Sequence, residues 1–174
     1  MATKKSMWLL FGILAISGWV LGSAIQAGAE TMNYKFYTWV IKSERVLVGD
    51  VEGHAMALTV RGVFMVLENG EVATADAVIT SDAIKGSGPF MQYVTMKFSD
   101  GSTIIVKSQG TVGGTATGSY TAGGWTSEII KGTGRFEGIK GTLTSKAKYL
   151  PVEKWEAGPK GYGEATITYT LPSK

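Results

Sequence analysis

The segment Ala165-Thr166-Ile167-Thr168-Tyr169-Thr170-Leu171 alternates apolar and polar side chains without a break. Because successive side chains of a β-strand point to opposite faces, this segment would place its four apolar residues on one face and its three threonines on the other. One apolar and one polar face are typical of a strand in an antiparallel sheet that covers a core. The segment therefore predicts an all-β fold.

The same alternation recurs towards the N-terminus. Two more segments have apolar residues at every second position. The first contains Val94, Met96 and Phe98. The second contains Met56, Leu58, Val60, Phe64 and Val66, with a glycine at position 62. The second set is one candidate for the face that lines the interior. Asn69-Gly70 and Asp100-Gly101 stand between such segments, and these dipeptides are strong hairpin signals. The chain is therefore expected to run as consecutive antiparallel strands.

Strands are predicted near residues 33–42, 45–49, 54–67, 71–80, 90–99, 103–111, 125–131, 141–150 and 162–172. Eight or nine strands in a domain of this size favour a single small antiparallel barrel of about eight strands, because closure removes unpaired edges. A two-sheet β-sandwich is the alternative. No internal repeat or linker divides the chain, so residues 30–174 are expected to form one β-barrel domain.

Residues 1–29 have the pattern of a secretory signal peptide. Lys4 and Lys5 precede an uncharged run over residues 7–25, and Ala27-Gly28-Ala29 provides the small residues that signal peptidase accepts. The alternative is an uncleaved signal anchor, since the run has about the 20 residues that a membrane helix needs. We expect a secreted or periplasmic protein, in contact with a membrane only if this segment is retained.

Composition excludes several kinds of site. The chain has no cysteine and one histidine, so it has no disulfide, no thiolate metal site and no two-histidine metal site within one chain. Without Lys4 and Lys5, 15 basic residues face 14 acidic ones, and no basic run marks a nucleic-acid surface. We expect no metal, no cofactor and no nucleic acid. A homo-oligomer stays open.

Two further motifs carry a resemblance. The run Gly132-Thr133-Gly134-Arg135-Phe136-Glu137-Gly138-Ile139-Lys140-Gly141-Thr142, and the upstream hairpin Phe98-Ser99-Asp100-Gly101-Ser102-Thr103-Ile104, resemble segments of the allene oxide cyclase-like barrel superfamily. This superfamily includes plant allene oxide cyclases, dirigent proteins and uncharacterised bacterial secreted proteins. The resemblance implies an eight-stranded antiparallel barrel with a lumen. It carries over no catalytic residue, because no active-site motif of the plant enzymes matches here.

The ionisable residues offer few candidates for catalysis. Asp50, Glu52 and His54 alternate along the chain, and an extended backbone would place all three on one face. If that face lines the lumen, His54 with Glu52 could transfer a proton near neutral pH. The alternative is a solvated loop between Gly49 and Gly53. Asp76 is a second acid–base candidate, and an outward, solvated position is the favoured interpretation for it.

Aromatic residues offer a candidate ligand site. Those near glycine-rich loops, where a barrel would have its mouth, are Phe90, Tyr120, Trp125, Trp155 and Tyr162. Aromatic walls with a few polar groups suit a small apolar ligand, although the same residues could instead cap a filled core. We expect a barrel that binds a small apolar or amphipathic molecule. The alternatives are a cofactor-independent cyclase or isomerase and a non-enzymatic envelope scaffold.

Overall fold

The computed structural model describes residues 28–114, 120–154 and 156–173. Its elements in chain order are β1 (Glu30–Leu47), β2 (His54–Leu67), β3 (Val72–Ile84), β4 (Gly88–Phe98), β5 (Thr103–Gly114), β6 (Tyr120–Thr133), the 3-10 helix η1 (Gly134–Phe136), β7 (Lys140–Tyr149) and β8 (Gly161–Thr170). Within the described part of the chain, no helix is long and apolar enough to cross a membrane. The predicted signal segment lies almost wholly outside the described residues.

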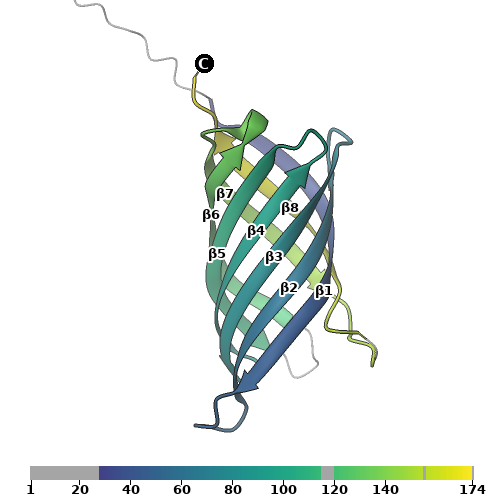
Figure 1. Cartoon of the computed structure of the whole chain (residues 1–174), viewed down its shortest axis with the longest axis vertical. Helices are drawn as coiled ribbons and strands as arrows, with labels where there is room; N and C mark the ends of the chain where they lie inside the picture. Colours follow the sequence, from purple (N-terminus) through teal and green to yellow (C-terminus); the bar gives the residue numbers. More distant parts are fainter. Residues whose placement is uncertain (1–27, 115–119, 155, 174) are drawn as a thin grey trace, which may run out of the picture.

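The eight strands form one closed barrel in which each strand pairs with its neighbours in the sequence (Figure 1). Closure comes from β1 and β8, which pair antiparallel from Glu30 opposite Tyr169 to Thr38 opposite Gly161. The predicted barrel is confirmed, and the β-sandwich alternative is wrong. The predicted strands 33–42 and 45–49 form the single strand β1, whose pairing with β2 shifts register between Val40 and Lys42. A bulge of this kind bends a strand without ending it.

The two predicted hairpins are confirmed. Gly70 and Gly101 have φ angles of 85° and 83°, a backbone conformation that glycine adopts without steric cost. The Gly70 amide donates to the Leu67 carbonyl at 2.9 Å, and the Gly101 amide donates to the Phe98 carbonyl at 3.0 Å. Both turns lie at the same end of the barrel, because one links β2 to β3 and the other links β4 to β5.

This end of the barrel is closed by η1, the short helix at the top of Figure 1. Phe136 is 3% exposed, and its ring centroid lies 4.8 Å from that of Phe98 and 6.4 Å from that of Tyr169. Below it, the largest fully buried side chains are Met96, Ile104, Val106 and Ile167. The 3-10 helix η1 is therefore a plug over a hydrophobic core.

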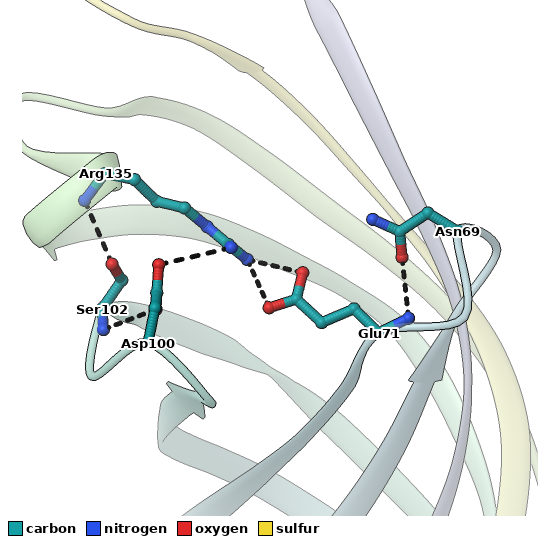
Figure 2. Close-up of polar contacts among 5 residues, drawn as sticks. All are labelled: Asn69, Glu71, Asp100, Ser102 and Arg135. Atoms are coloured by element: carbon teal, nitrogen blue, oxygen red, sulfur yellow. Dashed lines mark hydrogen bonds and ion pairs between the residues drawn. The ribbon is translucent and has the colours of Figure 1, made fainter.

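Arg135 fixes the plug to two hairpins (Figure 2). Its Nη2 atom donates to both carboxylate oxygens of Glu71, at 2.8 and 2.7 Å, and Nη1 lies 3.3 Å from Asp100. The Arg135 backbone amide donates to Ser102 Oγ at 3.1 Å, and the guanidinium lies 4.8 Å from the ring centroids of Phe98 and Phe136. The closed end is thus held by one cation, two carboxylates and two aromatic rings.

The condition that would have directed His54 and Glu52 into the lumen is not met. The apolar face of β2 points outward: Met56 and Phe64, for example, are 56% and 43% exposed. The interior side of β2 carries Ala55, Ala57 and Met65 instead. Alternation alone does not decide which of the two sets of alternate residues faces inward. In β2 the small residues face inward, and the lumen beside them is consequently not filled.

Candidate functional site

The lumen contains a cavity of about 740 Å³. Side chains of β1, β2, β3, β4, β5 and β7 line it, together with residues 157–159 of the loop before β8. Small-molecule sites typically have volumes of about 300–1,000 Å³, so this cavity is large enough for one small ligand. Eight-stranded barrels are either filled by side chains or leave room for one small ligand, and the described side chains do not fill this barrel.

Small side chains keep the cavity open. Ala55 and Ala57 on β2, Ala77 and Ala83 on β3, and Ala147 on β7 all line it. The floor of the cavity, towards the plugged end, is formed by the larger side chains of Tyr34, Met65, Met96 and Val106, which also belong to the hydrophobic core. Burial raises the pKa of the Tyr34 hydroxyl well above its ordinary value of 10.0, so the floor is neutral at physiological pH.

Arg61 is the principal polar group inside the lumen. It lies on β2 between the apolar floor and the mouth, and it is 9% exposed. Its Nε atom donates to Thr38 Oγ1 at 3.1 Å, and Nη2 donates to the Pro159 carbonyl at 2.6 Å. Its guanidinium lies 5.4 Å from the ring centroid of Tyr149. Burial lowers the pKa of Arg61 from its ordinary value of 12.5, but a guanidinium remains charged at physiological pH.

Apart from Arg45, the other polar groups described in the wall are uncharged. Ser108 on β5 lines the cavity, and its hydroxyl oxygen lies 2.9 Å from that of Ser127 on β6; both residues are buried. Gln92, Ser81 and Ser145 also line the cavity. These groups would let the lumen accept a molecule with some polar atoms, because buried polar atoms need hydrogen-bond partners.

His54 lies at the end of the barrel opposite the plug and is absent from the cavity wall. Its Nδ1 atom lies 2.5 Å from Asp50 Oδ1, and its Nε2 atom lies 2.6 Å from Asp82 Oδ1. Hydrogen bonds to Asp82 and Asp50 raise the pKa of His54 above its ordinary value of 6.5, and the bond to His54 lowers the pKa of Asp50. This arrangement ties the β1–β2 loop to β3.

The predicted partner of His54 lies elsewhere. The Glu52 side chain is 91% exposed and forms an ion pair with Lys85, with 3.5 Å between its Oε2 and the lysine Nζ. Neither Glu52 nor His54 lines the cavity. A proton relay formed by these two residues therefore receives no support from the geometry. Asp76 faces outward, as favoured from the sequence, and its Oδ2 lies 2.5 Å from Lys97 Nζ.

The predicted aromatic site is only partly described. Phe90 lines the cavity on β4, whereas Tyr162 is 49% exposed outside the cavity wall. The side chains of Tyr120, Trp125 and Trp155 lie outside the described residues. The aromatic residues that sequence reasoning missed are Tyr34, Phe36 and Tyr149, all in the cavity wall.

Arg61 was also missed, although the sequence contained a signal for it. It interrupts the apolar run Val60-Arg61-Gly62-Val63, where a charge inside a strand demands a partner.

Comparisons with known proteins agree with the barrel. No family model matches the chain, and no curated protein matches it by sequence. Among solved structures, a pterocarpan synthase dirigent protein is similar in fold, with a TM-score of 0.50 and 13% sequence identity. The similarity covers 95% of this chain and 100% of that chain. At this identity the likeness shows a shared fold alone.

Proposed function

We propose that this chain is a binding protein that holds one small apolar or amphipathic molecule inside its barrel. The observation that carries the proposal is the cavity of about 740 Å³ in the lumen, with an apolar floor and a polar zone above it. Empty apolar volume is costly to maintain, because a filled core gains contact energy that a hollow one forfeits. A barrel with alanines at several of its inward positions therefore suits a ligand.

The cyclase or isomerase alternative is less well supported. Such an enzyme needs a proton donor or acceptor that reaches the substrate, and His54 and Glu52 do not line the cavity. The ionisable residues that do line it are Tyr34, Arg45, Arg61 and Tyr149 among the described positions. Burial moves the pKa of Tyr34 away from neutrality. An envelope scaffold, the second alternative, would not need the cavity at all.

Binding of a neutral fluorescent dye tests the proposal. N-phenyl-1-naphthylamine is expected to bind wild-type protein at one site with increased emission. Ala57→Trp adds a bulky side chain to the lumen and should weaken the dye's affinity at least tenfold. Leu58→Trp is the matched control, because the neighbouring side chain is exposed on the outer surface. It should leave the affinity unchanged.

Two outcomes would contradict the proposal. In the first, the dye does not bind wild-type protein. In the second, Ala57→Trp and Leu58→Trp weaken binding equally, which would locate the dye on the outer surface. Circular dichroism of both variants would show that the barrel has folded.

We further propose that the domain is exported, which is supported by the leader-like pattern of residues 1–29. N-terminal sequencing of the protein expressed with its full chain tests this. A mature N-terminus at Glu30 is expected. A membrane-bound protein that starts at Met1 or Ala2 would contradict cleavage.

A further inference from the structure

The charged side chains that line the lumen, among the described residues, are all positive. Among the described residues that line the cavity, the charged ones are Arg45 and Arg61, and none is a carboxylate. Arg45 is exposed near the end of β1, whereas Arg61 is more than nine-tenths buried. A cavity of low polarity with one sign of charge concentrates the electric field and attracts ions of the opposite sign.

The partners of Arg61 are all neutral. They are the Thr38 hydroxyl, the Pro159 carbonyl and the ring of Tyr149. Arginine is rarely buried unless it is paired, because removing a charge from water costs more than neutral hydrogen bonds return. Among the described residues, no acceptor lies within hydrogen-bond distance of Nη1, which leaves that side of the guanidinium available to another molecule.

Arg135 provides the contrast within the same chain. It is more exposed than Arg61, yet its guanidinium contacts the carboxylates of Glu71 and Asp100. Arg135, which loses less hydration, thus has two anionic partners. Arg61, which loses more hydration, has none among the described residues. An anionic partner for Arg61 would have to lie in the cavity that this residue lines.

We propose that Arg61 binds the carboxylate of an amphipathic ligand, whose apolar part lies on the floor formed by Tyr34, Met65 and Met96. This inference rests on the proposed function and specifies the chemical class of the ligand. A planar guanidinium is well suited to a carboxylate, which can accept from two of its N–H groups. Because the other described groups near Arg61 are neutral, a single negative charge balances the site.

Two probes with the same ten-carbon chain test the proposal: decanoate and 1-decanol. Each is measured by its displacement of N-phenyl-1-naphthylamine from the lumen at constant ionic strength. A neutral apolar cavity would prefer 1-decanol, because it would have to desolvate the carboxylate of decanoate. The wild-type protein should instead bind decanoate at least tenfold more tightly than 1-decanol.

Substitution of Arg61 should remove this preference. Arg61→Gln is expected to weaken decanoate binding by about ten- to a hundredfold, the usual worth of a hydrogen bond to a charged group. Its affinity for 1-decanol should stay within about threefold of wild type. Lys97→Gln removes one positive charge from the outer surface and is the matched control, with decanoate binding unchanged. Arg61→Lys keeps the charge and should retain part of the preference.

The outcomes separate the two proposals. If 1-decanol binds but decanoate is not preferred, or if Arg61→Gln leaves decanoate binding unchanged, the role of Arg61 is overturned and lumen binding stands. If neither probe displaces the dye from wild-type protein, the role of Arg61 is overturned; if the dye itself does not bind, both proposals are overturned. Should Arg61→Gln fail to fold, the wild-type ratio of the two affinities and the Arg61→Lys variant still decide the question.

Discussion

Arg61 and Pro159 lie 98 positions apart in the sequence and are joined by a hydrogen bond of 2.6 Å from Nη2 to the proline carbonyl. The bond links the interior of β2 to the loop that enters β8, so a lumen residue also positions part of the cavity wall. The same side chain pairs with Thr38 on β1. Removing the Arg61 charge from water lowers the stability of the ligand-free protein, because its partners among the described residues are neutral.

Arg61→Met should therefore leave the ligand-free barrel as stable as wild type, or more stable by about 1 kcal/mol. Methionine has a comparable length and fills apolar space without a charge to desolvate. Urea unfolding monitored by circular dichroism measures the effect. A loss of more than about 2 kcal/mol would show that Arg61 serves mainly to hold the loop at Pro159.

Arg135 should behave in the opposite way. Arg135→Ala removes the contacts to Glu71 and Asp100 and the stacking on Phe98 and Phe136, and we expect a loss of about 2 kcal/mol of unfolding free energy. Lys97→Ala is the control, because its pair with Asp76 is exposed and exposed pairs contribute less than about 1 kcal/mol. Equal effects of the two substitutions would argue against a special role for Arg135 at the plug.

The sequence predicted the barrel because the relevant signals are local. Alternation in residues 165–171 and the turns at Gly70 and Gly101 each depend on neighbouring positions. The sequence left open which face of β2 lies inward, because pairing with distant strands decides it.

The candidate site could not be predicted from the sequence because it is formed by residues far apart in the chain. His54 contacts Asp82, which lies 28 positions later, rather than the nearby Glu52. Arg61 becomes a candidate only when Thr38, Tyr149 and Pro159 are known to surround it. Neither arrangement has a signature within one segment of sequence.

The His54 cluster should make stability depend on pH. The folded-state pKa of His54 is raised, so its contribution is fully present below about pH 6.5 and is lost as the pH rises through the folded-state pKa. The pKa of Asp50 is lowered, so its contribution is lost only in strong acid, below its ordinary value of 3.8. Melting temperatures of wild-type protein should therefore fall as the pH rises above about 6.5.

His54→Gln should flatten this part of the profile, because glutamine does not titrate. Titration of the imidazole by NMR in wild-type protein gives the pKa directly and should exceed 6.5. Asp82→Asn should bring that value down, since Asp82 makes the largest contribution to the shift. A wild-type imidazole pKa at or below 6.5 would refute the arrangement.

Gly62 and Trp39 provide a test of the outer surface. The two residues pair across β1 and β2, and a Cβ atom on Gly62 would overlap the indole ring of Trp39. Gly62→Ala should displace the partly exposed ring into solvent, shift its emission to the red and cost about 1 kcal/mol of stability. In a Trp39→Phe background the cost should be smaller, and an equal cost in both would show that the ring is not the obstacle.

The methionine methyl groups lie on both sides of the barrel wall, so their resonances can show whether a ligand binds in the lumen or on the outer surface. Met65 and Met96 are each 2% exposed and form the cavity floor, whereas Met56 and Met91 are 56% and 40% exposed on the outer surface. The decisive measurement is a titration of protein labelled with ¹³C at the methionine methyl groups, with decanoate as the ligand. If decanoate binds inside the barrel, the Met65 and Met96 resonances should shift and saturate together while those of Met56 and Met91 stay in place. Shifts confined to Met56 and Met91, with Met65 and Met96 unchanged, would contradict binding inside the barrel.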